Sequence, residues 1–189
     1  MKKGMLINID HMSQASANAT IALAQSQRGG YPLNSGHNGV RGALGSDTSE
    51  RSFTRQQYQQ IGALHGMAGI GSAKLNSTLW LLNYTTVIQA MGPGAVAGFG
   101  TDFDGMEFGM PPRLGSAVQY GTQAFPLQMS SDGNKSWDYN KVGVAHYGML
   151  PDFLQDVLSL QGGAALISNM NNGGQYFYDT WYMAENGSQ

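Results

Sequence analysis

The sequence has no cysteine, few charged residues and no long apolar run, and each of these absences excludes a class of function. Without cysteine, the chain of 189 residues contains no disulfide, no thiolate metal ligand and no cysteine nucleophile. Charged residues make up 12% of the sequence, against about 25% in an average soluble domain. The net charge of -2 offers no basic surface, so we expect no nucleic-acid partner. No segment approaches the ~20 apolar residues of a membrane span, so we also expect no membrane-spanning segment.

The residues that are present indicate a folded domain. Hydrophobic residues account for 41% of the chain, and 189 residues are enough for a single domain, 1–189, with its own core. Because charged residues are scarce, we expect asparagine, glutamine, serine and threonine to cover the surface. Such a surface favours an exported protein, periplasmic or extracellular, whose targeting signal lies outside this sequence.

Short apolar runs alternate with helix-like segments along the chain. The predicted strands cover residues 5–10, 31–35, 66–71 and 95–101. The predicted helices cover residues 15–27, 54–64, 75–91, 151–160 and 176–183, with Ser13 and Thr54 as N-caps of the first two. This alternation has no hairpin signal between its strands, so it predicts an α/β fold with a parallel sheet.

The number of strand–helix units limits the architecture. Four units are half of an eight-stranded TIM-type (β/α)8 barrel, and a complete barrel usually needs ~250 residues. We therefore predict a partial barrel, while the pattern also allows a small open sheet. Residues 106–140 form a long segment after the last strand, and we interpret it as a loop or lid over the site, or as a packing flap.

Side chains suited to chemistry stand at the ends of three predicted strands. They are Asp10 with His11, His37, and Asp102. The carboxyl ends of parallel strands share one edge of a sheet, where α/β folds carry their sites. Imidazole is the commonest zinc ligand, although a lone histidine is more often structural. We expect the two remaining histidines, His65 and His146, to be structural or pocket-lining.

Four segments resemble, in order and spacing, the C-terminal half of the membrane (renal) dipeptidase family. They are residues 8–13 (NIDHMS), 32–37 (PLNSGH), 51–54 (RSFT) and 98–105 (GFGTDFDG). Members of this family are zinc metallopeptidases with an amidohydrolase-type barrel. The resemblance implies a metal-dependent hydrolase that cleaves a dipeptide or a related amide bond.

The resemblance also implies a role for each matching residue. His11 and His37 would be zinc ligands of the second metal in a two-zinc site. Asp102 would be the catalytic aspartate that handles the proton of the attacking water, and Arg51 would bind the free carboxylate of the substrate. Taken alone, Arg51 is equally well explained as a solvated loop cation. Asp104 is better explained as a turn or capping residue before Gly105 than as a residue that exchanges roles with Asp102.

The chain departs from the family pattern in three places. It has no His-x-Asp strand for the first metal, and its glutamates, Glu50, Glu107 and Glu185, lie outside any position that bridges two metals. We therefore expect a two-metal site to be incomplete in this chain unless a missing N-terminal half supplies the rest. In addition, Ser-Gly-His replaces the family's Ser-His, which turns His37 to the other face of its strand unless a bulge absorbs the shift.

Functions from other classes stay open at this point. The chain is alternatively a non-catalytic half-barrel fragment, or a degenerate homologue, that acts as a structural or binding module and forms a homodimer to cover its open sheet edges. A third alternative is a small-molecule or glycan-binding module that uses the aromatic loop without metal.

Overall fold

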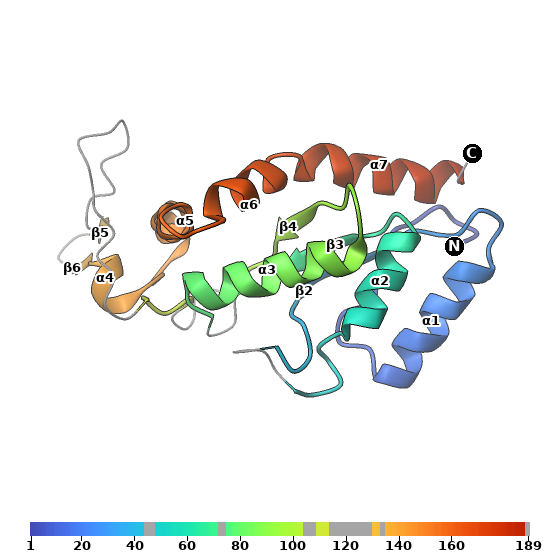
Figure 1. Cartoon of the computed structure of the whole chain (residues 1–189), viewed down its shortest axis with the longest axis horizontal. Helices are drawn as coiled ribbons and strands as arrows, with labels where there is room; N and C mark the ends of the chain where they lie inside the picture. The colour runs from blue at the N-terminus through green and yellow to red at the C-terminus, as the bar shows by residue number, and fades with distance from the viewer. Residues whose placement is uncertain (44–47, 72–74, 104–108, 114–129, 133–134, 188–189) are drawn as a thin grey trace.

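Four short strands form a parallel sheet in the computed structural model, which describes residues 1–43, 48–71, 75–103, 109–113, 130–132 and 135–187 (Figure 1). The strands are β1 (Ile7–Asn8), β2 (Leu33–Asn38), β3 (Met67–Ile70) and β4 (Ala97–Phe99). Their order in the sheet is β1-β2-β3-β4, and every neighbouring pair is parallel. The predicted α/β fold with a parallel sheet is therefore confirmed, as a four-stranded sheet with helices.

The three crossover helices begin close to the predicted residues. They are α1 (Gln14–Ser26), α2 (Arg55–Ala63) and α3 (Ser77–Met91). Ser13 caps α1 and Thr54 caps α2, as predicted, and Thr54 forms a reciprocal capping box with Gln57. Helix α3 begins at Ser77, two residues after its predicted start, because the Asn76 side chain caps it by accepting a hydrogen bond from the Leu79 backbone N–H.

The C-terminal third of the chain contains more structure than the sequence predicted. Helices α5 (Leu150–Leu158) and α7 (Gly173–Asn186) match two predicted helices. The other elements were not predicted: α4 (Tyr139–Val142), the 3-10 helix η1 (Tyr147–Met149), α6 (Gly163–Met170) and a hairpin of β5 (Ser130–Asp132) with β6 (Lys135–Trp137). Most of the predicted 106–140 loop or lid lies outside the described residues, as does Asp104.

The core lies between the sheet and α3. Ala68 and Ala97 are fully buried on adjacent strands. Trp80 of α3 contacts Phe99 of β4 and Phe153 of α5, with ring centroids 5.0 and 5.5 Å apart. These edge-to-face contacts bury large aromatic areas and join the C-terminal helices to the sheet.

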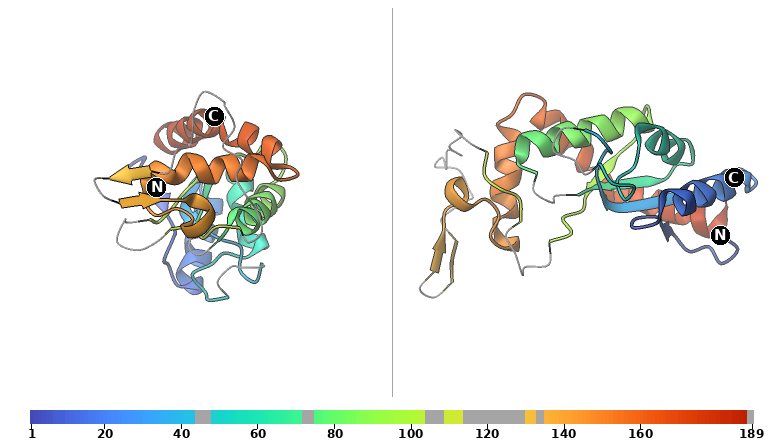
Figure 2. Two further views of the ribbon diagram at one scale, coloured as in Figure 1. Left: turned by 90° about the vertical axis from the view of Figure 1, so that its left-hand side faces the viewer. Right: turned by 90° about the horizontal axis from the view of Figure 1, so that it is seen from below.

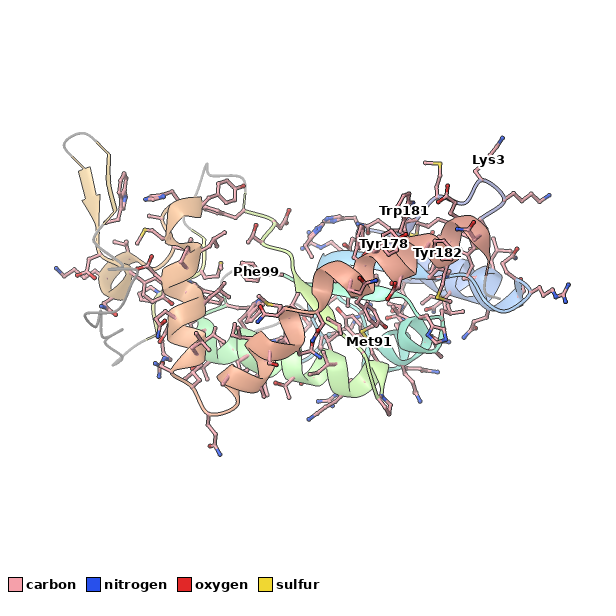
Figure 3. The ribbon with its side chains drawn as sticks, turned by 90° about the horizontal axis from the view of Figure 1, so that it is seen from above. Lys3, Met91, Phe99, Tyr178, Trp181 and Tyr182 are labelled. Atoms are coloured by element: carbon pink, nitrogen blue, oxygen red, sulfur yellow. The ribbon has the colours of Figure 1, made fainter. Side chains whose placement is uncertain are left out.

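Helix α7 lies on the side of the strands opposite α1 and α2 (Figures 1 and 2). The hydroxyl of Thr180 donates a hydrogen bond to the His65 carbonyl, just before β3. The opposite side of α7 carries exposed aromatic rings, among them Tyr178, Trp181 and Tyr182 (Figure 3). No helix in the described part of the chain is both long and apolar enough to span a membrane.

Side chains, rather than a further strand, occupy the outer edge of β4. The Asn169 amide of α6 accepts a hydrogen bond from the Ala97 N–H and donates one to the Ala95 carbonyl. The hydroxyl of Tyr84 donates to the Ala97 carbonyl, at 2.8 Å. These bonds satisfy backbone groups that would otherwise recruit another strand.

Replacing Asn169 with alanine is expected to lower the free energy of unfolding by about 1–3 kcal/mol, because the change removes the partners of buried backbone groups. Asn172→Ala is the matched control, since the Asn172 amide donates only to Ser168 of its own helical turn and is exposed. Chemical denaturation of the two variants measures the difference. Equal midpoints would show that Asn169 does not stabilise the β4 edge.

Three buried tyrosines predict that the fold loses stability in alkaline solution. Burial raises the pKa of Tyr58, Tyr84 and Tyr139 above the ordinary value of 10.0, and nearby carboxylates add to the rise for Tyr58 and Tyr139. Above pH 10 the unfolded chain therefore binds fewer protons than the folded one, so the free energy of unfolding falls as pH rises. Denaturant titrations at about pH 8 and about pH 11 test this, and equal stabilities would contradict it.

Candidate functional site

Three residues predicted from separate strand ends lie together at the carboxyl edge of the sheet. The Nε2 atoms of His11 and His37 are 2.8 Å apart. The Nε2 atom of His37 is 3.9 Å from Oδ2 of Asp102. The Asp102 side chain is 61% exposed and that of His37 is 26% exposed. These exposed fractions leave the cluster open to a small molecule from solution.

A bulge in β2 turns His37 toward this cluster. The register between β2 and β3 shifts between Ser35 and Asn38, so the strand contains the irregularity that the Ser-Gly-His spacing requires. A bulge re-aims the side chains that follow it. The extra residue therefore does not turn His37 away from His11.

Glycines allow the strands to approach each other closely beside His37. A Cβ atom at Gly69 of β3 or at Gly100, just after β4, would collide with the carbonyl oxygen of Gly36. Because both positions lack a side chain, the end of β4 reaches the end of β2 across β3. This close approach places Asp102 next to His37.

Two members of the cluster have left-handed backbone conformations. His11 has φ 62° and Asp102 has φ 49°, and the one other described non-glycine residue with positive φ is His65. Such conformations are uncommon for residues with a side chain, and strained residues concentrate at functional sites. These left-handed conformations turn the chain shortly after β1 and β4.

The carboxylate of Asp10 lies behind the histidine pair, with its side chain 3% exposed. Its Oδ1 accepts hydrogen bonds from Ser35 Oγ at 2.7 Å and from Asn38 Nδ2 at 3.2 Å. Its Oδ2 accepts the backbone N–H groups of Gly36 and His37. Asp10 was expected at the strand end without a functional role. Its position directly before His11, a candidate metal ligand, is a sequence feature that could have indicated one.

Arg51 comes to the edge of the site through its backbone. Asn38 Nδ2 donates to the Arg51 carbonyl at 2.7 Å, which ties this loop to the end of β2. Gln14 at the start of α1 joins the same loop, because its backbone N–H donates to the Glu50 carboxylate and its side-chain oxygen accepts from Arg41. Arg41 also donates to the carbonyls of Glu50 and Ser52. The Nε atom of Arg51 is 3.5 Å from Ser49 Oγ of its own loop.

The other two histidines lie apart from this cluster. The His65 carbonyl accepts the Thr180 hydroxyl, and the His146 Nδ1 accepts the Gly148 N–H while its ring packs edge-on against Trp137. Among the described residues, the buried Nε2 of His146 has no hydrogen-bond partner. The His146 ring is thus packed inside the C-terminal part of the chain, whereas the role of the exposed His65 side chain stays a prediction.

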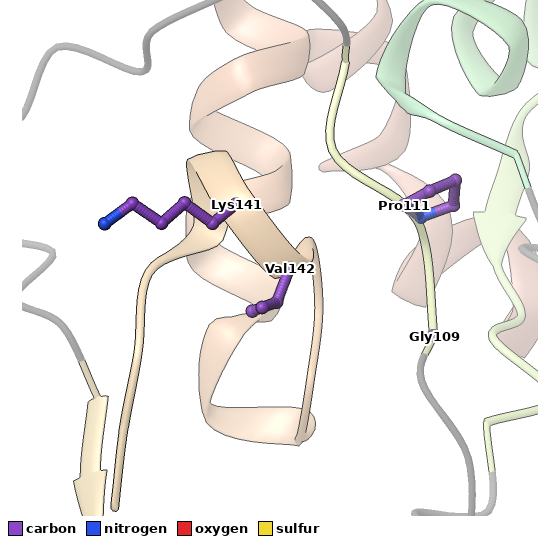
Figure 4. A pocket seen from close by; sticks show the side chains of 4 residues that line it. All are labelled: Gly109, Pro111, Lys141 and Val142. Atoms are coloured by element: carbon purple, nitrogen blue, oxygen red, sulfur yellow. The ribbon is translucent and has the colours of Figure 1, made fainter.

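A pocket of about 310 Å³ lies between the segment that contains Gly109 and Pro111 and helix α4 (Figure 4). The described residues that line it are Gly109, Pro111, Lys141 and Val142. No residue predicted to bind metal or substrate is among them.

The residues of the cluster fit part of a zinc coordination sphere. Two imidazole Nε2 atoms converge, and a carboxylate backs one of the rings, which is a common arrangement at histidine metal sites. Within the described ranges, however, no three histidine, aspartate or glutamate side chains are grouped so that they could hold a metal ion. The described residues therefore offer two imidazole ligands for a zinc ion.

No protein-family model matches the chain, and a search of curated proteins finds no match. The fold and the cluster define a mixed α/β protein whose histidine and carboxylate side chains meet at the carboxyl edge of a parallel sheet.

Proposed function

We propose that this chain is a dipeptidase-like, metal-dependent hydrolase, or the C-terminal half of one, with a partial TIM-type barrel as its fold. The observation that carries the proposal is the convergence of His11, His37 and Asp102 from three separate strand ends. Those three positions also match the motifs that resemble the membrane dipeptidase family. A parallel sheet with this cluster at its carboxyl edge agrees with how barrel enzymes build their sites.

Each residue of the cluster has a distinct part in the proposed reaction. His11 and His37 are the residues that would hold a metal ion, through their Nε2 atoms. A bound zinc ion supplies a Lewis acid that lowers the pKa of water and polarises a carbonyl group. Asp102, whose side chain is 61% exposed, accepts a proton from the attacking water and returns it to the leaving amine. The proton balance closes, because the amide gains one hydroxyl and one hydrogen from water.

Arg51 is the proposed contact for the substrate carboxylate. A guanidinium group binds a carboxylate in a bidentate manner, which selects a substrate with a free C-terminus. The Asn38 bond to the Arg51 carbonyl keeps this loop beside the cluster.

The first test is zinc binding by the full chain. We expect about one zinc per chain, because one pair of imidazoles converges and the sequence lacks the His-x-Asp ligands of the other metal in the family's two-metal site. His11→Ala and His37→Ala should each lower the affinity by tenfold or more, whereas His65→Gln, outside the cluster, should not. Elemental analysis and calorimetry measure this, and wild-type affinity in both alanine variants would contradict the proposed ligands.

The second test separates catalysis from metal binding. If the zinc-loaded chain hydrolyses dipeptides, Asp102→Asn should lower kcat by about 10²–10⁴-fold without changing zinc content, because the amide cannot accept the proton. Asp138→Asn is the matched control, since Asp138 caps α4 outside the site. Unchanged turnover in Asp102→Asn would remove this residue from the mechanism.

One observation favours the second candidate, a non-catalytic half-barrel that serves as a structural or binding module. The described residues provide no third metal ligand. A chain that binds no zinc and hydrolyses no dipeptide would support this alternative. Because Asn169 and Tyr84 already occupy the β4 edge, a homodimer of such a module would have to use another surface.

A further inference from the structure

The two oxygens of the Asp10 carboxylate have different surroundings. Oδ1 accepts hydrogen bonds from the side chains of Ser35 and Asn38. Oδ2 accepts the backbone N–H groups of the β2 bulge and also lies 3.5 Å from His37 Nδ1. The first oxygen therefore fixes the carboxylate in place, and the second faces the backbone and the ring of His37.

We propose that Asp10 is the positioning residue of the cluster, which holds the β2 bulge and keeps a hydrogen on His37 Nδ1 so that the Nε2 lone pair faces His11. An unprotonated Nδ1 would place its lone pair 3.5 Å from the negative oxygen of Asp10. The Asp102 carboxylate lies farther from Nε2, at 3.9 Å, and is largely exposed, so Asp10 has the stronger effect and favours the Nδ1–H tautomer. In a neutral imidazole, that tautomer leaves Nε2 free to accept a hydrogen or to bind a metal.

The contact between the two histidines agrees with this tautomer. At 2.8 Å, one Nε2 must donate and the other must accept. If His37 Nε2 accepts, His11 Nε2 donates, so the two rings hold opposite tautomers when no metal is bound. That Asp10 orients His37 for binding a metal rests on the proposed function. The expected tautomers of His11 and His37 do not depend on that function.

Because the Asp10 carboxylate is buried, losing its hydrogen bonds would cost free energy. The Asp10 side chain is 3% exposed, and a carboxylate removed from water needs several hydrogen bonds to offset its lost hydration. Four donors supply them, two of which are backbone groups of the bulge. The same bonds therefore stabilise the charge and determine the path of β2 through Gly36 and His37.

Imidazole nitrogen NMR on the metal-free full chain at about pH 8 tests the proposal directly. We expect His37 to carry its hydrogen on Nδ1 and His11 to carry its hydrogen on Nε2. A hydrogen on His37 Nε2 in the wild-type chain would overturn the proposal. This measurement needs no variant, so it stands even if changes at Asp10 prevent folding.

Asp10→Asn removes the charge at nearly constant size. We expect the fraction of Nδ1–H tautomer at His37 to fall and zinc affinity to weaken by about 10–100-fold. Ser35→Ala is the matched control, because it removes one of the two hydrogen bonds to Oδ1. Asn38 and the two backbone N–H groups still donate to the Asp10 carboxylate, so this variant should keep the wild-type tautomer. A folded Asp10→Asn chain with the wild-type tautomer would also overturn the proposal.

The two readouts separate this inference from the proposed function. If the wild-type chain binds no zinc, the hydrolase proposal fails, while the His37 tautomer still decides the role of Asp10. If zinc binds but His37 carries its hydrogen on Nε2, the role of Asp10 fails and the metal site stands.

Discussion

The buried carboxylate of Asp10 is the interaction on which the geometry of the site depends. It lies after β1 and accepts hydrogen bonds from the side chains and the backbone of β2. A buried charge needs hydrogen-bond donors around it, so these bonds fix the position of β2 relative to the end of β1. The bulge that aims His37 is therefore held by a neighbouring strand.

A second buried carboxylate organises the C-terminal helices in a similar way. Asp156 of α5 is fully buried and accepts hydrogen bonds from Ser77 of α3, Tyr139 of α4 and Arg113. In a sequence with so few charges, two of its carboxylates serve as junctions between elements. Removing one partner of such a buried pair costs far more than removing a surface pair, because the remaining charge loses its compensation.

The edges of the sheet explain how four strands persist without closing into a complete barrel. Asn169 and Tyr84 satisfy the backbone of β4, and β1 contributes only two residues to the other edge. A short strand and an edge covered by side chains both discourage pairing with another chain. Within the described residues, the backbone groups at the β4 edge are thus satisfied by side chains of the same chain.

The sequence by itself determined the local elements and their direction. Apolar runs bounded by glycine, together with the caps Ser13 and Thr54, are signals within a few residues, so the strands and crossover helices were predictable. The positions of His11, His37 and Asp102 at strand ends followed from the same pattern. Only the tertiary structure decided the bulge in β2, the close approach at Gly36 and the hydrogen bonds of Asp10. Those features depend on contacts between strands that are distant in sequence. The pattern of apolar and polar residues within one segment does not predict such contacts.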